Sequence, residues 1–347
     1  MIQTSLLKKK KHPQGDFTFI DLFAGIGGTR LGFESVGGRC VFSSEWDKYS
    51  QRTYAENFGE TPHGDITKIR SETIPDFDVL LAGFPCQPFS SIGKRQGFLH
   101  ATQGTLFYEV ARIIKDKRPK SFMLENVQGL LTHDNGKTFS TILDVLDELD
   151  YEVQYQVLNA ADYGVPQMRK RIYIVGFDRK CLGDDASFNF PKKIVKKHAD
   201  IGDFIVDEPT GKYAISEHLQ KSYLFKKDDG RPVVVDIHTK GAAKTLVASY
   251  HKIQRLTGTF VKGGATGMRL FTEGECKSLM GFPQDFIIPV SRTQMYRQFG
   301  NSIVVPVVAA IADAMKPSII KAVHGEGVID EQQHAIAANR SHAYGSL

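Results

Sequence analysis

A cysteine held between two prolines is the residue in this sequence with the clearest capacity for chemistry. Cys86 lies in the turn Gly83–Ser90 (GFPCQPFS), directly after the apolar run Asp78–Ala82. A thiolate on a stiff turn at the end of a strand is a candidate nucleophile, whereas a structural cysteine lies more often within a strand. The remaining cysteines lack the CxxC spacing of a zinc site or a disulfide framework, so we expect them to fill space in the interior: Cys40, Cys181 and Cys276.

A carboxylate and a basic segment border two further apolar runs. Glu125 follows the run Ser121–Leu124, and Gln167–Arg171 (QMRKR) precedes the run Ile172–Phe177. At the same sheet edge as Cys86, a carboxyl group could protonate or hydrogen-bond a substrate. Alternating basic side chains suit a phosphate or a carbonyl oxygen. Each has an ordinary alternative, because a glutamate at a strand end is often only solvated and a short basic segment alone is a weak signal.

A glycine-rich turn indicates a bound nucleoside. The segment Asp21–Gly28 (DLFAGIGG) follows a strand and opens a helix, but Arg30 occupies the position of the third glycine in the dinucleotide fingerprint. Glu45 closes the next apolar run, where an acid can bind ribose hydroxyls, and Trp46 can stack on an adenine ring. We place Asp65-Ile66 at the third strand position, where an acid can accept a hydrogen bond from an adenine amino group. Together these residues predict a nucleoside-containing cofactor without the diphosphate of NAD.

The elements that must position these residues alternate between strands and helices. Strands are predicted at Phe17–Phe23, Cys40–Ser44, Asp78–Ala82, Ser121–Leu124 and Ile172–Phe177, and helices at Gly28–Ser35, Lys48–Asn57, Leu106–Lys117 and Thr138–Leu149. This alternation predicts an α/β fold with a mostly parallel sheet, whose ligands lie at the carboxyl ends of the strands. Residues Ser91–Gly104 are rich in glycine and glutamine, and we expect them to form a mobile active-site loop or an ordinary surface connection.

The pattern changes after Phe177. Residues 179–269 contain 17 Lys and Arg against 10 Asp and Glu, a net charge of +7, whereas the whole chain carries +5. This segment is either a solvated surface or a basic module that faces a polyanion. Its predicted strands are Val233–Ile237 and Thr245–Ser249, and helices return at Thr272–Met280 and Ser302–Met315. We therefore divide the chain into a catalytic domain 1–180, a smaller irregular β-rich domain 181–270, a returning segment 271–325 and a polar tail 326–347 without periodicity.

Length and composition exclude several classes of protein. The 347 residues are 41% hydrophobic and 24% charged, as in folded soluble domains and unlike collagen, coiled coils or disordered polymers. No apolar run approaches the roughly 20 residues of a bilayer span. The lysine run in residues 1–11 has no apolar core after it, so it is not a secretory signal. We expect the protein in the cytoplasm.

In combination, these motifs resemble those of the DNA (cytosine-5) methyltransferases, especially the compact bacterial and phage enzymes of restriction–modification type. The resemblance covers Phe17 to about Val323 and rests on DLFAGIGG, GFPCQPFS, ENV, QMRKR and the late RQFGNS at Arg297–Ser302. It implies a Rossmann-like S-adenosylmethionine-dependent fold. Domain 181–270 falls where the family keeps its variable target-recognition domain, and Thr245-Leu246 is similar to that domain's short Thr-Leu element.

The resemblance also implies a role for each site residue. Cys86 matches the nucleophile, Glu125 the acid that engages cytosine N3, Arg171 the arginine at the cytosine carbonyl and Arg169 a supporting arginine. S-adenosylmethionine is the implied methyl donor, S-adenosylhomocysteine its product, and no metal is implied. The matching cofactor positions are Phe23, Gly25, Ile26, Gly28, Glu45, Trp46, Asp65, Ile66, Pro85, Leu106 and Asn301.

The implied partner is double-stranded DNA, with the target cytosine extruded from the stack. We expect a monomer without membrane association, acting in a prokaryotic cell, with a cognate restriction endonuclease as candidate companion. Three alternatives stay open. A tRNA cytosine-5 methyltransferase shares much of the architecture, and a catalytically silent DNA-binding relative would keep the fold. A nicotinamide oxidoreductase is disfavoured by Arg30 and by the unexplained Pro-Cys-Gln turn.

Overall fold

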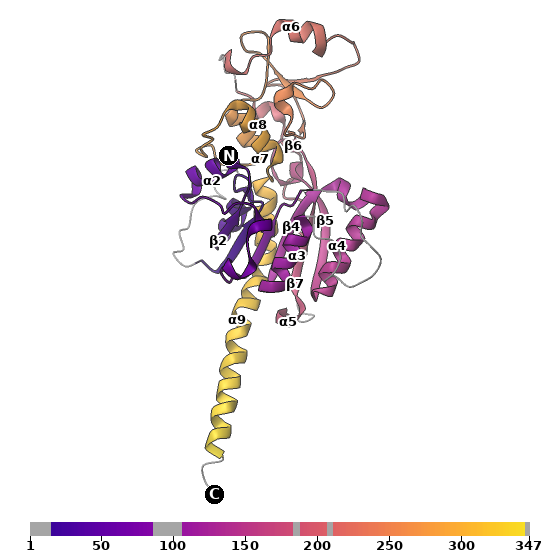
Figure 1. Cartoon of the computed structure of the whole chain (residues 1–347). Coiled ribbons are helices and arrows are strands. Elements are labelled where there is room, and N and C mark those ends of the chain that lie inside the picture. The colour runs from indigo at the N-terminus through magenta and orange to yellow at the C-terminus, as the bar shows by residue number, and fades with distance from the viewer. Residues whose placement is uncertain (1–14, 86–105, 183–187, 207–210, 344–347) are drawn as a thin grey trace.

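The chain forms an α/β domain that carries a smaller module at one end and a long helix at the other (Figure 1). This computed structural model describes residues 15–85, 106–182, 188–206 and 211–343, with side chains described up to residue 325. The six-stranded sheet has the order β2-β1-β3-β4-β7-β5, with bounds Gly38–Ser44, Phe17–Leu22, Val79–Ala82, Ser121–Val127, Lys170–Asp178 and Tyr151–Asn159. Strands β2, β1, β3 and β4 pair in parallel, whereas β7 is antiparallel to β4 and β5.

Alternating side chains build a hydrophobic core on each face of this sheet. Val79 and Leu81 of β3 point into one core, and Leu80 and Ala82 into the other, as the two-residue period of a strand requires. The first core contains residues of α1 and α9, and the second contains residues of α3 and α4. The helices have the bounds α1 Gly28–Glu34, α2 Lys48–Phe58, α3 Leu106–Lys117, α4 Lys137–Glu148 and α5 Arg179–Leu182. The predicted α/β class is confirmed, although β5 was not predicted.

The smaller module is built from short strands. A three-stranded sheet has the order β11-β10-β8, with bounds Met268–Arg269, Thr259–Lys262 and Val233–Val235, and the module also holds the short helix α6 Glu217–Leu219. A second, two-stranded sheet joins the module to the α/β domain, because β6 Gln167–Met168 pairs in parallel with β9 Ala243–Lys244. The predicted strand Thr245–Ser249 is wrong, because strand structure ends at Lys244. Side-chain hydrogen bonds to Thr245 and Leu246 hold the following residues in place of strand pairing.

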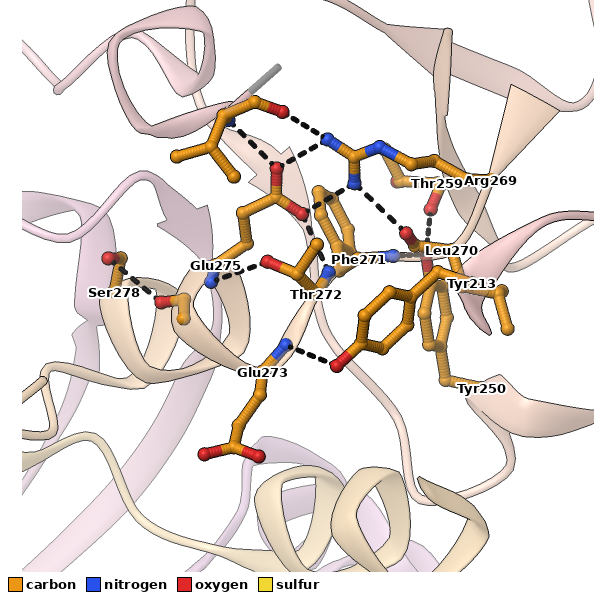
Figure 2. Close-up of polar contacts among 12 residues, drawn as sticks. Tyr213, Tyr250, Thr259, Arg269, Leu270, Phe271, Thr272, Glu273, Glu275 and Ser278 are labelled. Atoms are coloured by element: carbon orange, nitrogen blue, oxygen red, sulfur yellow. Dashed lines mark hydrogen bonds and ion pairs between the residues drawn. The ribbon is translucent and has the colours of Figure 1, made fainter. Parts of the chain in front are cut away.

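A buried ion pair fastens the module to the returning segment (Figure 2). Arg269 and Glu275 form two parallel bonds of 2.8 Å with side chains only 2% and 1% exposed. Arg269 also donates to the Val206 carbonyl at 2.6 Å, and Glu275 accepts from the Val206 amide at 3.0 Å. Glu275 further accepts from the Thr272 amide, which completes a capping box at the start of α7 Glu273–Met280. One carboxylate thus ties residue 206, the end of the module and α7 together.

Glu275→Gln is expected to lower the free energy of unfolding by about 3–5 kcal/mol, because it leaves the Arg269 charge buried without its counter-charge. Urea unfolding followed by circular dichroism measures this loss. Glu217→Gln is the matched control in the module: Glu217 pairs with Lys221, and the two side chains are 67% and 82% exposed, so its loss should stay below about 1 kcal/mol. Equal losses in the two variants would contradict a specific role for the buried pair.

The C-terminal part of the chain is more helical than predicted. Helix α8 Arg292–Asn301 was not predicted, and α9 runs from Val305 to Ala343, through Pro317 and through most of the polar tail, for which no helix was predicted. Alanine, glutamine and glutamate in residues 331–338 favour helix propagation. Among the described residues, the stretch Arg292–Gly325 is long and apolar enough by composition to span a membrane. Of its most apolar 18 residues, 56% are buried, and α9 packs on α1 in the core, as expected of an internal helix of a folded domain.

Candidate active site

The glycine-rich turn is held in a strained conformation by a buried carboxylate. Phe23 and Gly25 both have a φ of 56°, and for a phenylalanine this left-handed conformation is unfavourable unless the surroundings enforce it. Glu45, directly after β2, accepts from the Gly25 amide at 2.8 Å and from the Asp47 amide at 2.8 Å. Burial raises the pKa of Glu45, opposed by these hydrogen bonds. The predicted position of Glu45 at the end of the second strand is confirmed.

The neighbouring cofactor candidates surround this turn. Trp46 is 79% exposed, so its ring is free to stack on a ligand. The predicted third-strand position of Asp65 is wrong, because the third strand is β3 and Asp65 instead caps a 3-10 turn at Ile66–Lys68. Hydrogen bonds from Thr67 lower the pKa of Asp65. The Glu45 amide donates to the His63 carbonyl at 2.8 Å, so residues 63–65 still lie beside the end of β2.

The other predicted cofactor residues come from five separate segments. Ile66 is buried, and its carbonyl accepts from Arg112 of α3, the helix that begins at half-buried Leu106. Ile26 and Gly28 are buried in the glycine-rich turn Asp21–Gly28, whereas Asn301 and Pro85 are exposed. A Cβ atom on Gly28 would come within 2.8 Å of Ile303, so the segment that carries Asn301 packs directly against the glycine-rich turn.

Asp21 is a site candidate that the sequence did not single out for a role. It is fully buried in β1 beside the turn, and Thr29 donates to its Oδ2 at 2.6 Å. Its Oδ1 is buried and has no hydrogen-bond partner among the described residues. Burial raises the pKa of Asp21 to about 7. The only signal in the sequence was its place as the first residue of DLFAGIGG.

Glu125 and Arg171 come together at the other predicted centre. They lie on the antiparallel neighbours β4 and β7, and Arg171 Nε is 3.1 Å from Glu125 Oε1. Both side chains are largely buried, at 15% and 17% exposed. Burial raises the pKa of Glu125, opposed by the positive charges of Arg171 and Arg169. The site therefore holds a carboxyl group that keeps its proton to higher pH than a solvated glutamate, next to a fixed cation.

The Glu125 carboxylate faces the turn that leads to the predicted nucleophile. Its Oε2 lies 3.6 Å from where a Cβ atom of Gly83 would stand. Asn126 is buried and donates from its side chain to the Phe84 carbonyl at 2.9 Å, which fixes the start of the Pro-Cys turn. Asn126 was quoted in the ENV motif without a role. The turn is described as far as Pro85. Cys86 itself and the predicted loop Ser91–Gly104 lie outside the described residues.

Arg169 differs from Arg171 in its surroundings. It is 3% exposed, and its guanidinium donates to main-chain carbonyls of Leu246, Gly300 and Ser302. Gln167, also buried, binds the amide of Leu246 and the carbonyl of Leu279. The described residues contain no group of three or more His, Cys, Asp or Glu side chains placed to hold a metal ion.

Comparison with known proteins agrees with this geometry. The family model of the C-5 cytosine-specific DNA methylases matches residues 17–317. The Type II methyltransferase M.MspI of Moraxella sp. is 58% identical over 311 residues, which are 89% of this chain and 73% of that protein. The Type II methyltransferase M.BsuFI of Bacillus subtilis is 61% identical over 305 residues, or 88% and 74% of the two chains. Among solved structures, S. pombe Dnmt2 methyltransferase superposes with a TM-score of 0.69 at 20% identity, covering 87% of this chain and 99% of that one.

Proposed function

The chain belongs to the family of C-5 cytosine-specific DNA methylases, and from this premise we propose that the two clusters around Glu45 and Glu125 are its cofactor and catalytic sites. It is a DNA (cytosine-5) methyltransferase of restriction–modification type. The observation that carries the assignment is the pairing of Glu125 with Arg171 beside the start of the Pro-Cys turn.

S-adenosylmethionine use follows from the family, and the residues of the first cluster suit this cofactor. The buried, unpartnered Oδ1 of Asp21 offers an acceptor beside the turn, and the exposed Trp46 ring offers a stacking surface. When bound, S-adenosylmethionine supplies an electrophilic methyl group. We propose that the residues that hold it are Phe23, Gly25, Ile26, Gly28, Glu45, Trp46, Asp65, Ile66, Pro85, Leu106 and Asn301.

In the proposed mechanism, the Cys86 thiolate adds to carbon 6 of the extruded cytosine, and the electron pair of the ring double bond moves toward carbon 5. Glu125 donates a hydrogen bond or its proton to N3, and Arg171 donates to the carbonyl oxygen, so both stabilise the charge that addition places on the ring. Carbon 5 then bonds to the methyl group, and S-adenosylhomocysteine would leave with the electron pair of the broken methyl–sulfur bond. A base such as water takes the carbon-5 proton, the ring double bond re-forms, N3 returns any proton it received to Glu125, and Cys86 leaves as the thiolate. The raised pKa of Glu125 suits a group that must donate near neutral pH.

The remaining parts of the proposal concern partners. Duplex DNA binds between the catalytic domain and the basic module, and the protein works as a monomer in the prokaryotic cytoplasm beside an endonuclease of the same specificity. Light scattering of the purified protein, alone and with duplex, tests the monomer.

Bisulfite sequencing of DNA from cells that express the protein tests the function. Protected cytosines at one recurring sequence are expected in these cells and not in cells that express Cys86→Ala. A pattern identical in both cultures would refute the assignment.

An exchange of the module is expected to transfer sequence specificity. Replacing residues 181–267 by the matching module of a relative with another target should redirect methylation to that target. The physical reason is that base-edge contacts, worth about 1–3 kcal/mol per good bidentate pair, would lie in this module, while the chemistry stays outside it. Bisulfite sequencing of DNA treated with the hybrid measures the outcome. An active hybrid that still methylates the original site would place recognition in the catalytic domain.

A further inference from the structure

The guanidinium of Arg169 holds together three chain segments that are distant in sequence. Its Nη1 donates to the Leu246 carbonyl at 3.0 Å, and its Nη2 donates to the carbonyls of Gly300 and Ser302 at 2.9 and 2.8 Å. The first acceptor belongs to the module, and the other two flank Asn301. Burial and repulsion from Arg171 lower the pKa of Arg169 to about 10, so it keeps its charge near neutral pH. These three hydrogen bonds of the guanidinium all go to main-chain carbonyl oxygens, which suits a residue that orients the backbone.

The module segment that receives this bond is fixed from both sides. The Leu246 amide donates to Gln167 Oε1 at 2.7 Å, and the Thr245 hydroxyl donates to the Met168 carbonyl at 2.7 Å. The amide and the carbonyl of Leu246 are thus both bound by side chains of the segment that leads into β7. The Thr245-Leu246 element therefore has a defined position relative to Arg171, two residues beyond Arg169 on the same segment.

Gly300 brings the cofactor-side segment into contact with the same element. A Cβ atom at this position would lie 2.1 Å from the Ala248 nitrogen and 2.3 Å from the Val247 carbonyl carbon, distances that no side chain tolerates. The end of α8 and residues 247–248 therefore touch through their backbones. Because Ile303 packs on Gly28, this contact continues into the glycine-rich turn.

We propose that Arg169 is a positioning residue that couples the cofactor site to target recognition. Its hydrogen bonds make Gly300–Ser302 and Thr245-Leu246 one rigid unit with the central sheet. A cofactor bound beside Asn301 therefore stabilises Thr245-Leu246 in the position that this element takes when the module binds DNA. The identities of the two ligands rest on the function proposed above. By linkage, the same contact makes bound DNA favour the cofactor.

Amide hydrogen exchange of the ligand-free protein tests the mechanical part. In Arg169→Met, peptides that cover residues 245–249 and 299–303 are both expected to exchange faster than in the unaltered protein. Gly300→Ala disrupts the junction, meaning the contact between residues 245–248 and 300–302, by a clash with Val247 and Ala248. It should produce the same pair of changes with Arg169 intact. Arg179→Met removes an exposed arginine that pairs with Asp147 and Glu152, and Gly325→Ala fills open space on α9. Both controls should leave these peptides unchanged.

The coupling itself is measured as a ratio of affinities. S-adenosylhomocysteine should tighten duplex binding by the unaltered protein by a factor within the roughly 5- to 150-fold range of allosteric couplings. In Arg169→Met and Gly300→Ala this factor should fall to about 1, and Arg169→Lys should retain part of it because lysine keeps the charge and some donors. General destabilisation would lower the folded fraction, or weaken duplex binding equally with and without S-adenosylhomocysteine. It would leave the ratio of these two duplex affinities unchanged.

Each negative result has a distinct meaning. Unchanged exchange at 245–249 and 299–303 in both junction variants, or an undiminished coupling factor, would overturn the role of Arg169. Failure of the unaltered protein to bind S-adenosylhomocysteine would instead refute the proposed cofactor and the coupling with it, while the exchange experiment would still decide whether Arg169 holds the junction.

Discussion

Cys86→Ala is expected to lower the methylation rate by several orders of magnitude. It should also eliminate a covalent protein–DNA adduct that the unaltered protein is expected to form. A duplex with 5-fluorocytosine at the target position should trap this adduct, because fluorine at carbon 5 cannot leave as a proton. Loss of a nucleophile removes the whole covalent route, which is why the effect should exceed that of any other single substitution. A denaturing gel that resolves protein with attached DNA measures the adduct directly.

The environments of the other cysteines explain why Cys86 is expected to be the nucleophile. Burial raises the pKa of Cys40 to about 12 and that of Cys276 well above its ordinary value, so neither thiol ionises near neutral pH. Cys181→Ala is the matched control, since Cys181 is only half buried and its truncation leaves a smaller defect than that of Cys276. An adduct formed by Cys86→Ala, or lost in a folded Cys181→Ala, would contradict the assignment.

Local pattern was sufficient to predict the elements whose buried residues form an apolar run or a single apolar face. Strands β1, β3 and β4 are short apolar runs, and α3 shows one apolar face, so their positions follow from composition and period. Strand β5 lies at the sheet edge and alternates irregularly between buried and exposed residues, which leaves no apolar run to detect. Helix α8 is polar in sequence because its buried face includes Gln298, which accepts from Thr53 of α2.

Contacts between distant segments set the limit of prediction at the site. Glu125 was identified from its place at a strand end, and its partner Arg171 lies on the adjacent strand. The surroundings of Arg169 could not be inferred, because its acceptors are main-chain carbonyls 77 and 131 residues away that carry no mark in the sequence. The same contacts explain the wrong strand at Thr245–Ser249: Leu246 and Val247 are apolar, but side-chain bonds and the close approach of Gly300 replace a strand ladder.

Glu125→Gln is expected to reduce the methylation rate by about 10²–10⁴-fold and to leave S-adenosylhomocysteine affinity nearly unchanged. Glutamine keeps the size of the side chain and can still donate a weak hydrogen bond to N3, but it cannot transfer a proton. Single-turnover methylation of the target duplex measures the rate, and calorimetry measures the cofactor affinity. Glu152→Gln, an exposed glutamate on β5, is the matched control and should retain full activity. A collapse of cofactor affinity in Glu125→Gln would make Glu125 a cofactor-binding or structural residue.

The pH dependence gives a second, independent signature of Glu125. Burial raises its pKa, so the protonated form that we propose donates to N3 persists to higher pH than in a solvated glutamate, and it is lost as the pH rises through that raised value. The contribution of Glu125 to the single-turnover rate of the unaltered enzyme should therefore fall as the pH rises through this pKa. In Glu125→Gln this decline should vanish, because the amide has no proton to lose. A decline that survives the substitution would assign the titrating group elsewhere and leave Glu125 with a purely electrostatic role.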